Sequence, residues 1–358
     1  MTSSVASSQE WPWADSVSSG YRSSAKVNYV EPSVEVKKLE NNTAINPDVK
    51  KIIDDQIKKL PTRALLVGKG NEIFYEYYSS KNASKWTPLG YSMSKSLTAM
   101  AVGKAFCEGR IKNLNDPLGM YVTELQGTSW GNSSIKNVLM MSSGSYKTDI
   151  RLNGHKNKEI ETLLGRPMHT GQMNKDFISI MKEIDQKELK PGDFFYYNNM
   201  DTIALGLLVE ASTGKKFYKY FEESVWKPSG AESKGAWFAN NLNQTSTYQG
   251  FSASPHDWLR LGLYVLESRS KADCFGKFLE EGTQKIINTN LGFLPPSYGF
   301  QIWVNCRLEV DFCFVGFGRQ NLWFNLKKNV VMYHHAAVDR LDESTLWSAY
   351  SNILDNIN

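Results

Sequence analysis

The sequence predicts an α+β fold, in which an antiparallel sheet is flanked by helices and carries an inserted, mainly helical lobe. Aromatic and β-branched segments typical of strands lie near both ends of the chain, at about 64–80 and 298–336. Between about 115 and 240 the apolar residues recur mainly at helical spacing. Strands at both ends with helices between them are typical of a single sheet built from the two chain ends.

The first elements can be placed in order from the N-terminus. Residues 1–48 are rich in Ser and Asn and predict an arm wrapped on the body of the protein. A helix is expected at about 47–60, because Asn-Pro offers a cap and a first turn before apolar residues at helical spacing. Two strands joined by a Gly-containing turn follow at 64–80, and then a helix from Ser92 to about Glu108.

The later segments complete the pattern. Helices are expected at 135–143, 176–184, 201–214, 255–268 and 341–354, and strands at 298–306, 310–317, 321–328 and 329–336. This order predicts an arm (1–48), an α/β domain (49–115 with 241–358) and a helical domain (116–240).

Composition narrows the class of protein. The 358 residues are 41% hydrophobic and 22% charged, with a net charge of +4, so neither a nucleic-acid nor a membrane partner is expected. The N-terminus lacks the basic and apolar regions of a secretory signal, and no apolar run reaches about 18 residues. We therefore expect a cytoplasmic protein, with a homodimer as the candidate assembly.

Cysteine and histidine spacing gives no metal site. Cys107, Cys274, Cys306 and Cys313 form no C-x-x-C pair, and reduced thiols are expected in a cytoplasmic protein. Cys306 and Cys313 could still face each other across a hairpin. The histidines show no metal spacing either, and His334-His335 is expected at an exposed strand end. No metal or cofactor is predicted.

Ser92-Met93-Ser94-Lys95, at the start of a predicted helix, is the first candidate for chemistry. Residues three apart share one helical face, which brings the Ser92 hydroxyl near the Lys95 amine. A neutral amine can take the proton that makes a serine hydroxyl nucleophilic, and burial favours the neutral amine. A helix N-terminus also favours negative charge where an oxyanion forms.

Context separates Ser92 from other matches to the same pattern. S-x-x-K also occurs at Ser23, Ser133, Ser212, Ser224 and Ser268, and an unsupported match usually marks a solvated surface pair. The pair at Ser92 follows two strands and begins a helix whose body is apolar enough to be buried.

Two further segments can complete a site. Tyr197-Asn198-Asn199 lies in a loop before a long apolar helix. A phenol near a lysine ammonium can relay a proton. The side-chain amide of Asn199 can bind the lysine or a substrate carbonyl. Gly316-Phe317-Gly318 lies in a predicted strand, where glycine allows close approach and a backbone N–H can bind an oxyanion. An aromatic loop and a plain β-bulge are the structural alternatives.

Taken together, the motif order resembles the class C β-lactamase and penicillin-binding-protein superfamily. GYSMSKSLTAMAVGKAFCEGRI, IKNVLMMSSG, PGDFFYYNNMDTIALGLLVEASTGK and SASPHDWLRLGLYVL are similar to four blocks of that family, in the same order, across about residues 60–350. SMSKSL and GRQNLWFN look closest to nylon-oligomer (6-aminohexanoate-dimer) hydrolases and related carboxylesterases. The resemblance implies a β-lactamase/transpeptidase-like fold.

The resemblance also implies a role for each candidate residue. Ser92 would be the nucleophile, Lys95 its base and Tyr197 the proton relay. Asn199 would stand at the third position of the tyrosine motif, and the N–H groups of Ser92 and Phe317, the latter between Gly316 and Gly318, would bind the oxyanion. Tyr146, after the Ser-Gly turn, is a candidate cleft residue.

One departure from the family pattern bears on the substrate. Penicillin-recognising enzymes carry K-T-G or a close variant on the last motif strand, and this chain has Val-Gly-Phe-Gly-Arg, ending at Arg319. The missing lysine removes a cation for a substrate carboxylate, which favours small esters or amides. The alternatives are β-lactamase or D-Ala-D-Ala peptidase activity, and an inactive binding protein on the same fold.

Overall fold

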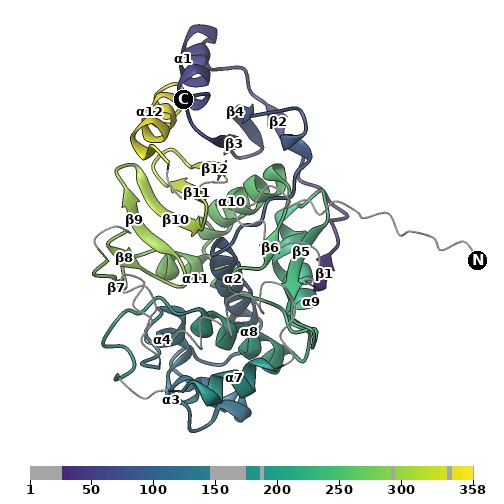
Figure 1. Cartoon of the computed structure of the whole chain (residues 1–358), viewed down its shortest axis with the longest axis vertical. Coiled ribbons are helices and arrows are strands. Elements are labelled where there is room, and N and C mark those ends of the chain that lie inside the picture. The colour runs from purple at the N-terminus through teal and green to yellow at the C-terminus, as the bar shows by residue number, and fades with distance from the viewer. Residues whose placement is uncertain (1–25, 146–174, 186–188, 292–294, 337–340, 358) are drawn as a thin grey trace, which may run out of the picture.

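The computed structural model describes residues 26–145, 175–185, 189–291, 295–336 and 341–357. Its main feature is a sheet in which strands from the two ends of the chain lie side by side (Figure 1). All neighbours in this sheet are antiparallel apart from the first pair, which is parallel. The order is β2 (Glu40–Asn41), β4 (Glu72–Tyr78), β3 (Thr62–Lys69), β12 (Val330–Ala336), β11 (Gln320–Asn325), β10 (Val310–Gly316), β9 (Trp303–Arg307), β8 (Ser297–Tyr298) and β7 (Ile287–Asn288).

Helices cover both faces of this sheet. Alternate residues of β12 point to opposite faces: Met332 belongs to the apolar cluster with α12, and Tyr333 to the cluster with α10. The helices are α1 (Pro47–Ile57), α2 (Met93–Cys107), α3 (Ser129–Asn132), α4 (Ile135–Leu139), α7 (Phe177–Glu183), α8 (Asn199–Thr213), α9 (Phe217–Phe221), α10 (Pro255–Arg269), α11 (Cys274–Gly282) and α12 (Glu343–Asp355). The predicted α+β fold is therefore confirmed.

A smaller sheet and several short turns complete the described chain. The strands β1 (Lys26–Val30), β5 (Gly235–Ala239) and β6 (Phe251–Ser252) pair antiparallel in that order, so that the N-terminal segment packs against β5. The short 3₁₀ or π turns are η2 (Ala83–Lys85), η3 (Leu118–Met120), η4 (Thr123–Leu125), η5 (Glu222–Trp226) and η6 (Lys227–Ser229). None of the described helices has the length and apolar character needed to span a bilayer.

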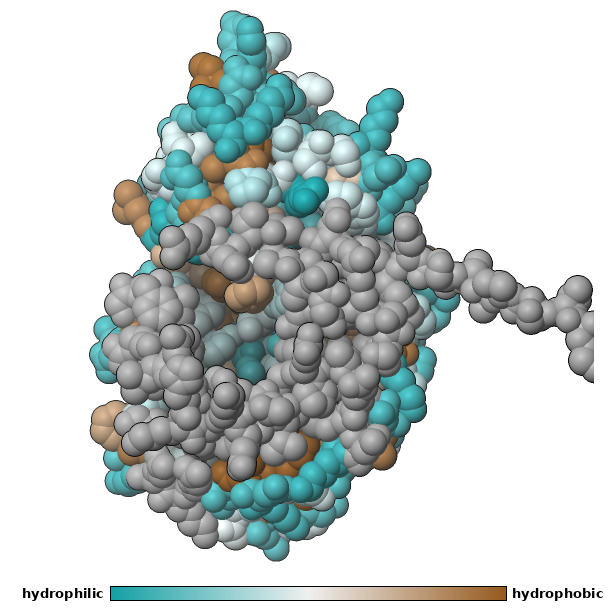
Figure 2. All heavy atoms as spheres, viewed as in Figure 1, coloured by the Kyte–Doolittle hydropathy of each residue, from teal (hydrophilic) through white to brown (hydrophobic). Residues whose placement is uncertain are grey.

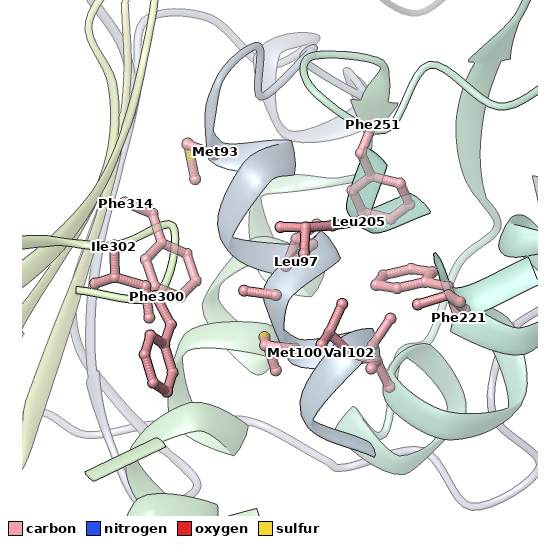
Figure 3. Packing of buried hydrophobic residues seen from close by; sticks show 14 of the residues in the cluster. Met93, Leu97, Met100, Val102, Leu205, Phe221, Phe251, Phe300, Ile302 and Phe314 are labelled. Atoms are coloured by element: carbon pink, nitrogen blue, oxygen red, sulfur yellow. The ribbon is translucent and has the colours of Figure 1, made fainter. Parts of the chain in front are cut away.

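Helix α2 runs through the middle of the molecule. Twelve of its fifteen residues are buried, and they lie on every side of the helix. A helix that is buried all round is enclosed by other elements. Figure 3 shows Phe221 and Phe251 on one side of α2 and Phe300, Ile302 and Phe314 on the other. The N-terminus of α2, where Ser92 lies, is therefore held by packing on several elements.

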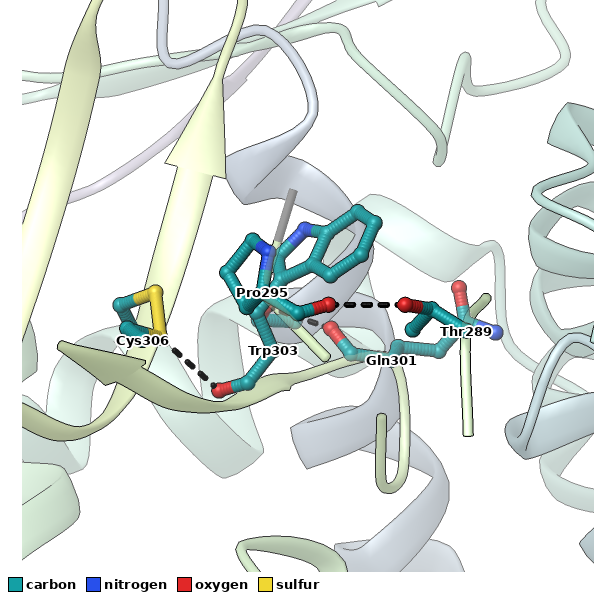
Figure 4. Close-up of a disulfide and its surroundings, with 7 residues drawn as sticks. Thr289, Pro295, Gln301, Trp303 and Cys306 are labelled. Carbon is teal, nitrogen blue, oxygen red and sulfur yellow. Dashed lines mark hydrogen bonds between the residues drawn. A yellow bond between two sulfur atoms is a disulfide. The ribbon is translucent and has the colours of Figure 1, made fainter. Parts of the chain in front are cut away.

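The cysteines differ from the expectation of reduced thiols, because all four form disulfides. Cys107 and Cys274 join the end of α2 to the start of α11, and Cys306 and Cys313 join β9 to β10. Figure 4 shows Cys306 close to Trp303 on the same strand. The first pair is 167 residues apart in sequence, so only the folded chain shows that these residues are neighbours. The cysteines therefore do not support the expected cytoplasmic location.

The expectation for His334 and His335 is also wrong. Both side chains are buried, because β12 is a central strand between β3 and β11 rather than a strand with an exposed end. His334 hydrogen bonds to the Thr62 hydroxyl and to the carbonyl of Arg319, both at 3.0 Å. Burial lowers the pKa of His334 to about 4 and that of His335 to about 3, so both rings are neutral at pH 7.

The two disulfides should contribute unequally to stability. In the chain-entropy model, closing a loop of 167 residues stabilises the fold by about 5 kcal/mol, and closing a loop of 7 residues by about 2.5 kcal/mol. Urea unfolding of the double variants C107S/C274S and C306S/C313S measures the difference. A larger loss from the Cys306–Cys313 pair would contradict this account.

Candidate active site

The segment before α2 holds Ser92 in a defined position. The Gly90 N–H donates to the carbonyl of Phe251 at 2.8 Å, and the Phe251 N–H donates to the Ser94 hydroxyl at 3.0 Å. Tyr91 has φ = 47°, a region that side chains other than glycine rarely adopt. Such a backbone persists only where its surroundings enforce it, and it places Ser92 as the N-cap of α2.

Lys95 lies beneath Ser92, one turn into the helix. Its Nζ is 3.2 Å from Ser92 Oγ and donates to the carbonyl oxygen of Tyr248 at 2.8 Å. The side chain is 1% exposed, and its Nζ lies 4.9 Å from the centroid of the Tyr197 ring. Burial holds the pKa of Lys95 well below its usual 10.5, which makes a neutral amine available beside the hydroxyl.

The Tyr197 hydroxyl reaches the same serine. It hydrogen bonds to the Ser92 side chain, and its ring stacks on Trp303 with centroids 5.4 Å apart. Burial raises the pKa of the Tyr197 phenol above its usual 10, and the bond to Ser92 opposes this rise. The phenol therefore stays protonated near neutral pH, so it can donate a hydrogen bond or pass on a proton.

The glycine segment differs from its predicted place in a strand. β10 ends at Gly316, and Phe317, Gly318 and Arg319 form the turn into β11. A Cβ on Gly316 would lie 2.2 Å from the carbonyl oxygen of Gly90, so only glycine allows the strand end to lie this close to the segment before Ser92. Gly318 and Arg319 follow with φ of 74° and 67°.

Phe317 lies on the exposed side of this turn. Its side chain is 56% exposed and packs its ring against Tyr91 in an edge-to-face contact, with centroids 5.7 Å apart. The end of β10 and the turn thus contact the segment before Ser92 through the backbone of Gly316 and the side chain of Phe317. The space-filling view is hollowed near its centre, where α2 lies in Figure 1, and both hydrophobic and hydrophilic side chains show in the hollow (Figure 2).

Arg319 does not present an unpaired charge. Its guanidinium forms an ion pair with Glu343 at the start of α12, and Arg307 pairs with the same carboxylate. A substrate carboxylate at Arg319 would therefore compete with Glu343 for the guanidinium.

The neighbours of Tyr197 differ in their roles. Asn198 is the N-cap of α8: its Oδ1 accepts the Met200 N–H at 2.8 Å, and its Nδ2 donates to the Ser145 hydroxyl at 3.2 Å. Asn199 begins the helix, and its amide makes no hydrogen bond to a described residue. Its role in binding stays a prediction, and Tyr146 lies outside the described residues.

The structure adds residues that sequence reasoning missed. The Tyr248 carbonyl binds Lys95, and Trp303 supports the Tyr197 ring. A backbone acceptor leaves no mark in a sequence, and Trp303 is one of ten tryptophans, so neither could be singled out. In the described part of the chain, His, Cys, Asp and Glu form no group of three or more that could hold a metal ion.

Comparison with known proteins agrees with the fold. The family model described as beta-lactamase matches residues 49–333, which is most of the chain. The chain belongs to the beta-lactamase family. This assignment explains why an antiparallel sheet and a helical region meet at the N-terminus of α2.

Individual relatives cover most of the chain. The 6-aminohexanoate-dimer hydrolase of Paenarthrobacter ureafaciens is 24% identical over 84% of this chain and 78% of its own. A Bacillus anthracis protein provisionally described as a 6-aminohexanoate-dimer hydrolase has the same fold, with a TM-score of 0.74 at 19% identity over 93% of this chain and 90% of that one. A penicillin-binding protein from Bacillus halodurans matches with a TM-score of 0.64 at 18% identity over 85% and 99% of the two chains.

Substituting Gly316 tests the close approach of the turn to Ser92. In Gly316→Ala the new methyl group would meet the Gly90 carbonyl and displace the end of β10 from the segment before Ser92. On the prediction that the Phe317 N–H binds the oxyanion, ester turnover should fall roughly 100-fold, as for loss of one such donor. Gly70→Ala is the control: it has φ = 62° and open space, and should lose about 1 kcal/mol of stability with unchanged turnover. Equal turnover in the two variants would contradict the assignment.

Proposed function

We propose that this protein is a serine hydrolase that cleaves ester or amide bonds of small, uncharged substrates through an acyl-enzyme on Ser92. The observation that carries the proposal is that three side chains meet at one point. Lys95 Nζ lies 3.2 Å from Ser92 Oγ, and the Tyr197 hydroxyl forms a hydrogen bond with the same serine side chain. A nucleophile with its base and a proton relay within contact is the arrangement that acyl transfer needs.

The first half of the reaction follows from these contacts. Neutral Lys95 takes the Ser92 proton as Oγ bonds to the substrate carbonyl carbon. The negative charge on the carbonyl oxygen is held by the N–H groups of Ser92 and Phe317. The bond to the leaving group then breaks, and the proton on Lys95 passes through Tyr197 to the leaving oxygen or nitrogen. The product of this half is an ester between Ser92 and the acyl group.

Water completes the cycle. It attacks the acyl carbon while giving a proton to Lys95, and the bond to Ser92 Oγ breaks as that oxygen regains the proton. The lowered pKa of Lys95 serves both halves, because only the neutral amine can accept a proton. No group beyond these side chains and the two backbone donors is required.

The substrate class follows from charge. Arg319 is the cation nearest in sequence to the position of the missing family lysine, and Glu343 competes with a substrate carboxylate for its guanidinium. The pairing therefore supports uncharged esters or amides over β-lactams and peptides that end in a carboxylate. The names of the two 6-aminohexanoate-dimer hydrolases place linear amides among the substrates to screen. A linear 6-aminohexanoate dimer ends in a carboxylate, so the charge argument expects a dimer with that carboxylate capped to be the better substrate.

Removing the nucleophile tests the proposal directly. Ser92→Ala should lower p-nitrophenyl butyrate turnover to background and abolish covalent labelling by a fluorophosphonate, because no other group can form the acyl-enzyme. Ser212→Ala is the matched control, since Ser212 and Lys215 share the S-x-x-K spacing and Lys215 pairs with Glu223 at the surface. Full turnover by Ser92→Ala would reject the serine mechanism. A wild-type protein that takes up no label would identify an inactive binding protein.

Comparing substrates tests the charge argument. Wild-type kcat/KM should be at least roughly tenfold higher for p-nitrophenyl butyrate than for nitrocefin, which carries a carboxylate, since a charged hydrogen bond is worth about 1.5–3 kcal/mol. Measurement of both rates in one buffer suffices. A preference for nitrocefin would favour the β-lactamase alternative and overturn the assignment of substrate class.

A further inference from the structure

A buried carboxyl group that the proposed mechanism does not use follows directly on the loop 189–198, which carries Tyr197 and is called here the tyrosine loop. Asp201, in the first turn of α8, is 1% exposed. Its Oδ1 accepts hydrogen bonds from the Ser143 hydroxyl at 2.7 Å and from Trp130 Nε1 at 2.9 Å, whereas its Oδ2 has no hydrogen-bond partner among the described residues. Burying a carboxyl with one unsatisfied oxygen costs folding free energy that an apolar side chain would not cost.

A continuous chain of hydrogen bonds links Asp201 to the tyrosine motif. The Ser143 hydroxyl gives its one hydrogen to Asp201, so in the 2.8 Å contact between Ser143 and Ser145 the donor is Ser145. The Asn198 amide then donates to Ser145 Oγ at 3.2 Å. Every donor in the chain points toward Asp201, which is the terminal acceptor.

The backbone around this chain is held in place. The Tyr196 N–H donates to the Met141 carbonyl and the Gly192 N–H to the Ser142 carbonyl, both at 2.8 Å. A Cβ on Gly144 would lie 2.4 Å from the Leu189 carbonyl oxygen, so the turn between Ser143 and Ser145 lies directly on the tyrosine loop. A change in the hydrogen bonds between these side chains should therefore alter the position of the tyrosine loop.

We infer that Asp201 is a positioning residue for Tyr197: through Ser143, Ser145 and Asn198 it holds the tyrosine loop so that the phenol meets Ser92. The inference rests on the proposed function, because it concerns the proton relay of that reaction. The hydrogen bonds of Asp201 go to Ser143 and Trp130 rather than to Ser92 or Lys95, so it acts through Asn198, which directly follows Tyr197.

The ionisation of Asp201 should change the strength of the hydrogen bonds that hold the tyrosine loop. Burial raises the pKa of its carboxyl to about 7, against the hydrogen bonds from Ser143 and Trp130. An ionised acceptor binds its donors more strongly, and the effect passes along a chain of hydroxyl groups. The ionisable groups on the elements around this end of α8 are Lys95 on α2, Lys136 on α4, Tyr197 in the preceding loop, Tyr298 on β8, and Asp185, which accepts the N–H of Ser129 in α3.

Comparing pH profiles tests the inference. Asp201→Asn keeps an acceptor for Ser143 but cannot ionise, so it should match wild-type kcat at pH 5.5 and fall roughly threefold to tenfold below it at pH 8.5, with KM unchanged. The ratio of the two kcat values isolates Asp201, because Lys95 titrates in both proteins. Ser145→Ala interrupts the chain with Asp201 still present and should show the same loss.

A stability measurement gives a readout that does not need activity. The carboxyl pKa rises from 3.8 to about 7 on folding, so wild-type unfolding free energy should fall as pH rises through that range. Asp201→Asn should lack this fall. Asp273→Asn, the N-cap of α11, is the control and should keep both pH dependences, since Asn caps as well as Asp.

The outcomes separate the two proposals. A wild-type pH profile of kcat in both Asp201→Asn and Ser145→Ala would overturn the positioning role while leaving the serine mechanism intact. Full turnover by Ser92→Ala would overturn the proposed function. If Asp201→Asn does not fold, Ser145→Ala alone decides, because its loss of the pH step supports the chain and its retention rejects it.

Discussion

The site depends on one buried amine. Lys95 is enclosed by the helix that carries Ser92, by the ring of Tyr197 and by the carbonyl of Tyr248. Removing an ammonium from water favours its neutral form, and only the neutral form can accept the serine proton. The packing around α2 keeps water away from this amine, and the strained backbone at Tyr91 holds the Ser92 hydroxyl in contact with it.

The surrounding elements meet around that point. α2 supplies Ser92 and Lys95, the loop before α8 supplies Tyr197, and the turn from β10 to β11 supplies a backbone that lies against Gly90. These segments are far apart in sequence, and each is held by a contact that a small change would disturb. Close-packed interiors transmit such displacements, so the fold and the geometry of the site are closely linked.

Much of this could be predicted from the chain alone. Apolar periodicity placed α8 and α10 within a few residues, and the context of Ser92 separated it from five other matches to its pattern. Contacts between distant segments could not be predicted: the cysteines pair through the fold, and His334 and His335 are buried because β12 is central. The turn at Phe317 was missed because a glycine in a strand and one in a tight turn look alike in sequence.

The pairing of β3 with β12 limits how early in synthesis the chain can complete its fold. Met332 lies opposite Val67, so the centre of the large sheet forms only when residues more than 260 positions apart have met. During synthesis α2 leaves the ribosome long before β10, β11 and β12 exist to cover it. The turn at Phe317 can therefore reach the segment before Ser92 only when nearly all of the chain has been made.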